Sequence, residues 1–509
     1  MNTDTTEIAR ASPQSPPRPA DRRRRYFARF LTMLLLGLTL QSIDPFGFLQ
    51  YTEKKTLDLF SFMMGPELPS TWNQEMAVVL IDDVFVETHS KWPMPYIDHA
   101  RVLKKILTFE PRAVFVDLLF TKDKDVKGIV PLILVLNEYK RKNIKVFVTS
   151  AESRSGMLPQ IANLVTPVTT RLTRDEIDYL DYRLWRESSM THQAPANALI
   201  GAYCARMPRD PERHEAWGLA CSRLLDPKQR GTESETVVLP NPNAKSELER
   251  GRDSETKVTL SFDSETMLLL WGTEEAEANW KAFRCNPEVG TSWHGQVINW
   301  VSLEPEDTLQ RCPRYPTLLL DNLLGGFPDD KLAEYLTDKI VFYGPEIEGA
   351  TVWTAPPTHE ALSATYTHAT ALENLLMFGK DYYVMDRKVL GVSLKSLFEL
   401  TIWTVLCLVV SFGAAVLKPI APGPEHSIGY RFLFDLSSFV MLSMVGILLT
   451  TVQVAAFHIA PANLLGIISI VFAISSVHSS EYFGYLEDRL QTLMRSLSFP
   501  PPQPQRPRP

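Results

Sequence analysis

Residues 78–96, VVLIDDVFVETHSKWPMPY, decide the fold of this 509-residue chain. An apolar run that begins at residue 76 has the length of a buried strand, and it ends in the paired aspartates Asp82 and Asp83. A Trp-Pro-Met-Pro loop follows, and beyond it apolar residues recur at helical spacing on one face. These residues are Ile97, Val102, Leu103, Ile106 and Leu107. The stretch therefore predicts a strand at 76–83 and then a helix.

The alternation of strand and helix continues along the chain. Residues 112–120 and 144–150 each have the pattern of a buried strand, and residues 129–142 between them have that of an apolar helix. Strands and helices that alternate at this spacing favour right-handed crossovers and a parallel sheet. The predicted fold class is α/β, with a parallel or mixed sheet and flanking helices.

The rest of this region is less regular. Residues 151–330 carry few signals apart from two short strands, at 236–240 and 258–262, which are expected to pair as a long hairpin. Residues 338–349 predict a strand that ends at a Gly-Pro turn. Residues 359–379 predict a packed helix. Its buried residues are expected to be Ala361, Leu372, Leu375 and Leu376.

Four apolar runs have about the length of a membrane-spanning helix, which needs about 20 residues to cross about 30 Å of hydrocarbon. They lie at residues 26–48, 398–417, 433–457 and 459–477. Arginines crowd the N-terminal side of the first run, so the positive-inside rule places that side in the cytoplasm. We expect four transmembrane helices in a bacterial inner membrane, with both termini cytoplasmic and residues 49–390 outside. The first run is expected to be an uncleaved anchor, with a cleaved signal peptide as the alternative.

Net charge and cysteine content limit the classes of partner and of metal site that the chain is expected to have. The formal net charge of −7 offers no polybasic surface, which argues against nucleic-acid binding. Four cysteines fall in the external segment, where an oxidising environment favours disulfides, and their spacing resembles no zinc site. Nearest-neighbour pairing would join Cys204 to Cys221 and Cys285 to Cys312, but three connectivities stay open.

The two tails are expected to be cytoplasmic. Residues 1–25 are rich in Pro, Ser and Thr and predict a disordered segment. Residues 478–509 combine a short heptad seam with a Pro-rich end, and this tail is too short to hold an output enzyme. The seam consists of Phe483, Leu486, Leu490, Leu493 and Leu497.

Two regions of the sequence resemble the CHASE2 domain, an extracytoplasmic sensory module of bacterial signalling proteins. The acidic pair, the Trp-Pro-x-Pro motif at 92–95 and the strand at 112–120 resemble its beginning. The Lys-Ile-Val strand at 339–341 and the His-Ala pair at 368–369 resemble its end. One departure concerns binding, because Tyr96 stands where the family has an arginine.

The resemblance covers about residues 76–150 and 335–380, and the segment between them is divergent. It implies a sensory domain between a membrane anchor and three further helices. Family members usually also carry a kinase or a nucleotide cyclase as the output domain.

Six residues are candidates for ligand contact. They are Asp82, Asp83, Trp92, His99, Asp117 and His368. The three aspartates follow predicted strands, and the carboxyl ends of parallel strands are where such sheets bind ligands. Asp82 and Asp83 would alternatively cap the next turn or helix, and Trp92 would cover the edge of the core. His99, His368 and Asp117 would alternatively form a metal or pH-sensing site.

The sequence carries no motif of a nucleophile elbow, a zinc protease or a phosphate loop, so we expect no enzyme and no cofactor. The expected function is a sensor for a small-molecule or protein signal in the periplasm. A homodimer is one option for its oligomeric state. The sensor would relay that signal through its membrane helices to a separate cytoplasmic protein docked on residues 478–509. The alternatives are an assembly protein of the cell envelope, whose external domain binds another protein, and a hydrolase that uses Asp82 and His99.

Overall fold

The computed structural model divides the chain into two compact units. The helical unit comprises Met1–Thr56, Lys388–Phe457 and Pro461–Pro509, and the α/β unit comprises Leu57–Arg387 and His458–Ala460. The structure describes residues 19–44, 47–120, 128–150, 157–169, 181–184, 194–206, 208, 213, 217–221, 236–239, 256–259, 266–272, 313–357, 359, 361–417 and 428–477. The predictions for the heptad seam and for Cys285 and Cys312 lie outside these residues.

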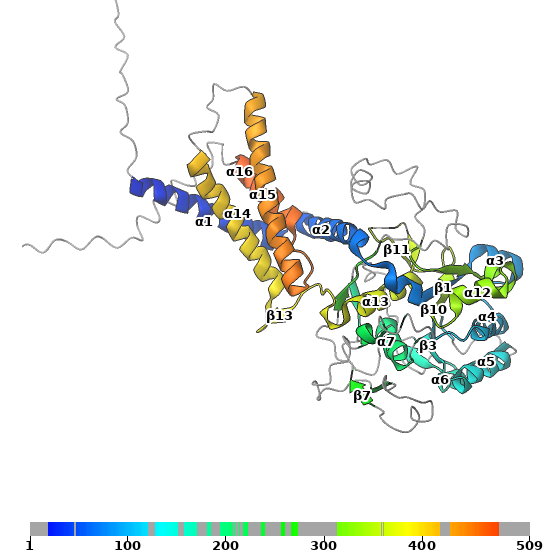
Figure 1. Cartoon of the computed structure of the whole chain (residues 1–509). Helices are drawn as coiled ribbons and strands as arrows, with labels where there is room; N and C mark the ends of the chain where they lie inside the picture. The colour runs from blue at the N-terminus through cyan, green and yellow to red at the C-terminus, as the bar shows by residue number, and fades with distance from the viewer. Residues whose placement is uncertain are drawn as a thin grey trace, which may run out of the picture. The chain divides into compact units, whose positions relative to one another are not determined.

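Six parallel strands form the central sheet of the α/β unit, in the order β4-β3-β2-β10-β1-β9. Figure 1 labels β1, β3 and β10 of this sheet. The six strands are β1 (Met76–Asp82), β2 (Ala113–Val116), β3 (Lys145–Thr149), β4 (Thr166–Val168), β9 (Thr317–Leu319) and β10 (Ile340–Glu346). Strand β10 pairs with β1 on one side and with β2 on the other, so it separates two strands that are consecutive in the sequence. Because every pair is parallel, all the carboxyl ends lie at one edge of the sheet.

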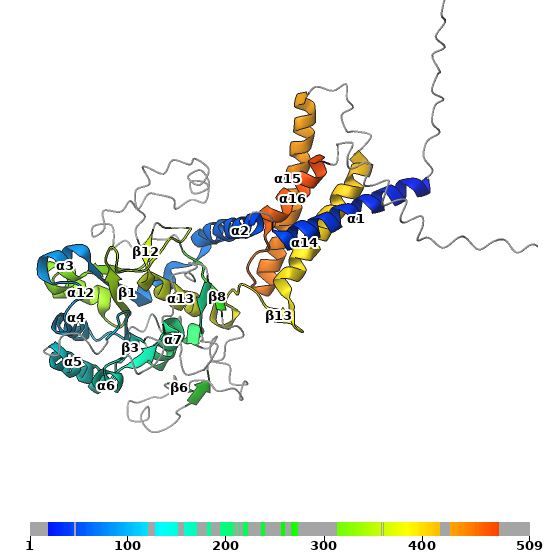
Figure 2. The ribbon, with the colours of Figure 1, turned by 180° about the vertical axis from the view of Figure 1, so that it is seen from behind.

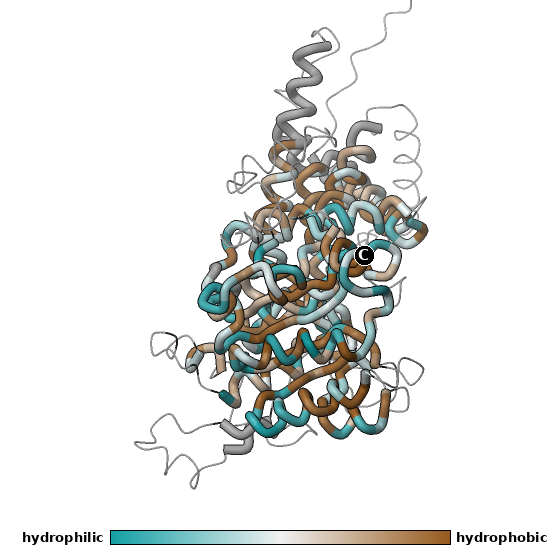
Figure 3. Tube along the Cα trace, turned by 90° about the vertical axis from the view of Figure 1, so that its right-hand side faces the viewer, coloured by the Kyte–Doolittle hydropathy of each residue, from teal (hydrophilic) through white to brown (hydrophobic). Residues whose placement is uncertain are grey.

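Helices cover both faces of the sheet, which is why its strands are continuous apolar runs. Helices α4 (Tyr96–Thr108), α5 (Ile129–Arg141) and α12 (Asp329–Leu336) share one hydrophobic core with the first face. Helices α7 (Pro195–Ala205) and α13 (Ala364–Phe378) pack against each other over the second face (Figure 2). In Figure 3, hydrophobic (brown) and hydrophilic (teal) residues alternate along the helices nearest the viewer, as expected for helices that bury one face.

Most predicted elements of the α/β unit are confirmed. The strands at 76–83, 112–120 and 144–150 are β1, β2 and β3, and the two predicted helices between them are α4 and α5. A short helix that was not predicted, α3 (Asp83–His89), directly follows β1. The predicted hairpin is present as β6 (Thr236–Leu239) paired antiparallel with β7 (Thr256–Thr259).

Three details of those predictions are wrong. Ile97 is exposed, because the buried face of α4 begins with Tyr96 and continues with Ala100. Ala361 precedes α13 and is exposed, since that helix begins at Ala364. Strand β10 does not turn at Gly344 but continues through it to Glu346.

One predicted disulfide is present among the described residues. Cys204, at the end of α7, is joined to Cys221, as nearest-neighbour pairing predicts. Helix α7 is buried along almost its whole length, so the disulfide fixes a core element of the unit.

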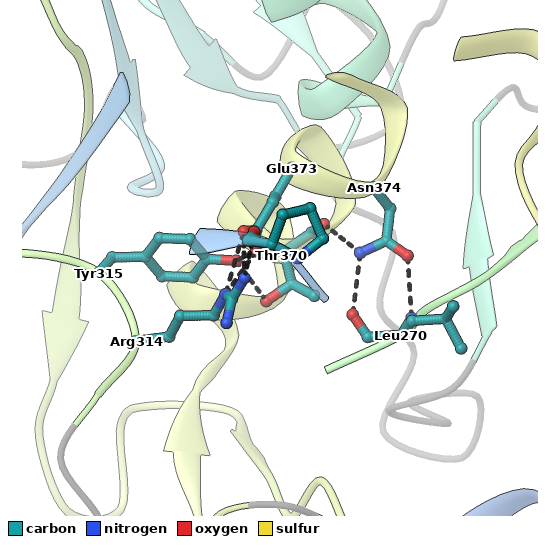
Figure 4. Close-up of polar contacts among 7 residues, drawn as sticks. Leu270, Arg314, Tyr315, Thr370, Glu373 and Asn374 are labelled. Atoms are coloured by element: carbon teal, nitrogen blue, oxygen red, sulfur yellow. Dashed lines mark hydrogen bonds and ion pairs between the residues drawn. The ribbon is translucent and has the colours of Figure 1, made fainter. Parts of the chain in front are cut away.

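Helix α13 carries a buried ion pair (Figure 4). The Arg314 guanidinium donates from Nε to both carboxylate oxygens of Glu373 (3.0 Å each) and from Nη2 to Oε1 (2.8 Å). The Tyr315 hydroxyl donates to Glu373 Oε2 (2.6 Å). The next helix residue, Asn374, exchanges two hydrogen bonds of 2.9 Å with the backbone of Leu270. These bonds attach α13 to segments that are distant in the sequence.

The helical unit contains α1 (Pro19–Ile43), α14 (Leu394–Leu417), α15 (Ile428–Phe457) and α16 (Leu464–Val477). Within the described residues, three helices are long and apolar enough to cross a membrane, over Tyr26–Ile43, Leu394–Ser411 and Val440–Phe457. Helix α16 is shorter than the predicted fourth span, because residues 459–463 are not helical. Three of the four predicted runs are therefore present as candidate membrane spans.

The first run differs from its prediction at both ends. Helix α1 begins at Pro19, inside the segment expected to be disordered, and ends at Ile43 instead of residue 48. Asp44 adopts a left-handed backbone (φ 41°) and accepts hydrogen bonds from the amides of Leu49 (2.7 Å) and Gln50 (3.4 Å). The left-handed backbone of Asp44 thus ends α1. Its carboxylate caps the first turn of α2 (Phe48–Met64), a helix that was not predicted, because the two amides belong to that turn.

Candidate functional site

A pocket of about 350 Å³ lies at the carboxyl edge of the sheet in the α/β unit. Its walls come from the loop that contains Trp92, the residues 117–120 after β2 and the residues 350–352 after β10. The start of α4 and the start of α13 close it from two sides, through His99 and Thr365. These segments come from opposite ends of the α/β sequence. The pocket forms because the order of strands in the sheet brings them to the same edge.

Asp117 is held in a fixed orientation beside this pocket. The hydroxyl of Thr149, at the end of β3, donates to Asp117 Oδ1 (3.0 Å), and the hydroxyl of Thr365 donates to Oδ2 (3.3 Å). The backbone amide of Asp117 donates to the Tyr343 carbonyl (2.8 Å). A carboxylate can accept about four hydrogen bonds, so each oxygen keeps capacity for a ligand donor.

Gly344 allows α13 to approach the sheet at this point. A Cβ atom there would lie 2.1 Å from Thr365 Oγ1 and 3.2 Å from Asp117 Cβ. No side chain fits at such distances, so glycine is required for the Thr365–Asp117 hydrogen bond to form. The glycine inside β10 therefore serves helix packing and not a turn.

The aromatic wall of the pocket is tied to the first face of the sheet. His99 Nδ1 and the Tyr343 hydroxyl lie 2.9 Å apart, and both side chains are buried. Tyr96 packs edge-on against Phe120, with ring centroids 5.8 Å apart. Trp92 lines the entrance, next to a cis bond to Pro93. Three of the predicted contact residues, Trp92, His99 and Asp117, are thus brought together.

The other three predicted residues lie elsewhere. His368 is buried on the second face of the sheet, where its Nδ1 lies 2.9 Å from the Tyr182 hydroxyl. Burial lowers the pKa of His368, and the nearby Asp117 opposes this. His99 and His368 therefore lie on opposite faces of the sheet and do not form the alternative three-ligand site with Asp117. Within the described ranges, no group of three His, Cys, Asp or Glu side chains could hold a metal ion.

Asp82 and Asp83 also lie outside the pocket lining. Asp83 Oδ2 accepts a hydrogen bond from the backbone amide of Glu348 (3.1 Å), which fixes the loop after β10. Asp82 pairs in register with Glu346 on the neighbouring strand, so the two side chains emerge on the same face. Burial, together with Asp82 and Asp83, raises the pKa of Glu346 to about 7. Burial also raises the pKa of Asp82.

This acid pair predicts a pH-dependent stability. Glu346 binds its proton more tightly in the folded than in the unfolded chain, so its contribution is most favourable below pH 4.5 and declines until about pH 7. Glu346→Gln should remove the decline and stabilise the fold above pH 7 by at most about 3 kcal/mol, with no gain below pH 4.5. Thermal unfolding across this range checks it, with the exposed Glu348→Gln as the matched control. Parallel profiles for wild type and Glu346→Gln would contradict the assignment.

Two functional side chains of the pocket were not predicted. Thr149 lies near the end of a predicted strand, and its place at the same sheet edge as Asp117 is a signal that could have identified it. Thr365 has no such signal, because its contact with Asp117 depends on how α13 docks. Gly344, where the sequence pattern indicated a turn, is the residue that permits this docking.

Comparison with known proteins gives one match. The family model of the CHASE2 domain matches residues 30–414. No curated protein and no solved structure matches the chain.

Proposed function

The chain belongs to the CHASE2 domain family, and from this premise we propose that it is a membrane-anchored sensor whose pocket at the sheet edge binds the signal. CHASE2 is an extracellular sensory domain, and the observation that carries the proposal is the oriented carboxylate of Asp117 beside a preformed cavity. The volume of about 350 Å³ is in the range of small-molecule pockets. The proposal assigns binding and no catalysis to this site.

The lining chemistry favours a particular class of ligand. Asp117 is the one carboxylate among the lining residues that the structure describes, and Tyr96 occupies the place of the family's arginine. Among the lining residues that the structure describes, none is a lysine or arginine that would balance the negative charges of Asp117 and an anionic ligand. A small molecule with an ammonium or hydroxyl donor for Asp117 and an apolar body for Trp92 and Phe120 fits better.

The proposed membrane arrangement has four spans. Helices α1, α14 and α15 are the three candidates supported by length and composition. The fourth would be residues 459–477, whose apolar helix α16 is shorter and would be extended by the apolar residues before it. With the arginines of the first helix in the cytoplasm, the α/β unit lies outside and both tails lie inside a bacterial inner membrane.

The proposed relay follows the connectivity of the chain. Thr365, which binds Asp117, is in the first turn of α13, and residues 379–393 join the end of this helix to α14. A ligand that shifts α13 would therefore act on a membrane span close to it in the sequence. The final output is proposed to be a separate cytoplasmic protein docked on residues 478–509, with a homodimer as the signalling state.

A second candidate function is assembly with another envelope protein. It is favoured by exposed apolar side chains next to the pocket, on Leu119, Val352 and Trp353. Exposed apolar groups of this kind can mark a protein interface. A ligand that binds the pocket of the isolated protein favours the sensor over this alternative.

Topology fusions test the proposed arrangement. Alkaline phosphatase folds only outside the cytoplasm, so a fusion after residue 380 should be active and one after residue 480 inactive. A β-galactosidase fusion at the same two positions should give the reverse pattern and controls for expression. An inactive phosphatase at position 380 would contradict an external α/β unit, whereas activity at position 480 would contradict the fourth span alone.

A further inference from the structure

A small hairpin in the helical unit has an apolar tip that plays no part in the proposed sensor function. Strands β13 (Lys388–Val389) and β14 (Val392–Ser393) pair antiparallel, and α14 begins at the next residue, Leu394. The exposed fraction is 49% for Val389, 99% for Leu390 and 57% for Val392. The tip thus leaves the Leu390 side chain almost fully exposed and those of Val389 and Val392 about half exposed.

The turn itself does not explain the leucine. Leu390 (φ 54°) and Gly391 (φ 82°) both adopt the left-handed backbone of a two-residue hairpin turn. Asn, Asp or Gly normally holds the first position, because other L side chains are strained there. A leucine at this position has an unfavourable backbone and an apolar side chain exposed to water. An apolar environment outside the protein around the Leu390 side chain would offset both the unfavourable backbone and the exposure to water.

We propose that this hairpin inserts Leu390 into the outer leaflet of the membrane, beside the start of α14. The inference rests on the proposed role of α14 as a membrane span, whose apolar window begins at Leu394. The hairpin directly precedes this window in the chain, so it lies where the polar surface of the bilayer meets the hydrocarbon. Leu397, on the first turn of α14, is also exposed and continues the apolar surface.

The charges around the hairpin fit a lipid surface better than a protein one. The exposed Lys388 is at the base of the hairpin and follows Arg387, and one acid, Asp386, precedes them. Cationic side chains beside an aliphatic tip can extend to lipid phosphates while the tip enters the hydrocarbon. The occupant is therefore anionic or zwitterionic lipid, and a second copy of the chain is the outcome that the experiment must exclude.

Photo-crosslinking of the full-length protein tests this directly. The residue p-benzoylphenylalanine is placed singly at positions 390, 134 and 444 in nanodiscs of phosphatidylglycerol and phosphatidylethanolamine. Leu134 on α5 is 64% exposed and Met444 on α15 is 67% exposed, so these two reference sites match each other in accessibility and both are open to a reagent. Position 134 belongs to the α/β unit and position 444 to a candidate span. Lipid adducts are then counted by mass spectrometry.

The expected result is lipid adducts at positions 390 and 444 and none above background at 134. Crosslinks from position 390 to a second copy or to the α/β unit, with no lipid adduct, would overturn the hairpin proposal and leave the spans intact. An absence of lipid adducts at position 444 would overturn the proposed spans, and the hairpin proposal with them.

Discussion

Glu373→Ala should lower the free energy of unfolding of the α/β unit by about 3–5 kcal/mol, because it removes the buried carboxylate that pairs with the guanidinium of Arg314. The lost carboxylate accepts four hydrogen bonds in the structure, three from Arg314 and one from Tyr315. Arg314 cannot move easily, because it also packs against Gly272, where a Cβ would lie 2.1 Å from its Nη1 atom. Chemical denaturation of the full-length protein in detergent, followed by tryptophan fluorescence, measures the loss.

Two variants separate the buried charge from other effects. Replacing both partners, in Arg314→Met with Glu373→Met, should recover most of the stability, because the two charges of this buried pair are removed together. Arg141→Ala removes a partner of the exposed ion pair with Glu138 and should change stability by less than about 0.5 kcal/mol. If Glu373→Ala costs no more than Arg141→Ala, the buried pair does not hold α13 in place.

Asp117→Asn should weaken ligand binding by at least about tenfold, because a hydrogen bond to a charged group contributes about 1.5–3 kcal/mol. The variant keeps the size of the side chain and an oxygen that can accept from Thr365 or Thr149. The probe is a defined set of small amines and alcohols with aliphatic or aromatic bodies, added to full-length protein while its thermal unfolding is followed. Compounds that raise the unfolding temperature of the wild type should, at the same concentration, raise that of the variant clearly less.

Two matched controls locate the effect at the pocket. Asp83→Asn removes an exposed negative charge at the same sheet edge but outside the lining, and it keeps an oxygen that can accept from the Glu348 amide, so it should leave ligand affinity unchanged. Thr365→Val removes one donor to Asp117 and should weaken binding less than Asp117→Asn does. Equal binding to wild type and Asp117→Asn would rule out this carboxylate as the ligand acceptor.

The sequence predicts the elements that have a strong local pattern. Strands β1, β2 and β3 are continuous apolar runs, and α4 has a clear buried face, so periodicity identifies them. Strands β4 and β9 are each three residues long and give no periodic signal. Helix α7 is buried on nearly all sides, so it has no polar face from which a helical period could be recognised.

The sequence predicted the sheet edge that holds the candidate site better than it predicted which residues line the pocket. The rule that ligands meet the carboxyl ends of parallel strands selected Asp117, which lines the pocket because β2 lies next to β10 there. The same rule selected Asp82, which instead faces Glu346, since a register position decides which face a side chain takes. His368 was misplaced because the sequence does not show which side of the sheet α13 covers. These errors arise from tertiary packing, which a local pattern does not contain.

Hydrogen–deuterium exchange of the full-length protein in nanodiscs, with and without the library compound that raises its unfolding temperature most, tests whether the pocket at the carboxyl edge of β2 and β10 is where the sensor binds its ligand. We expect the compound to slow exchange in peptides that cover residues 117–120, 350–352 and the start of α13, and to have no such effect in Asp117→Asn. Protection confined to other parts of the chain, or the same protection in the variant, would contradict binding at this pocket.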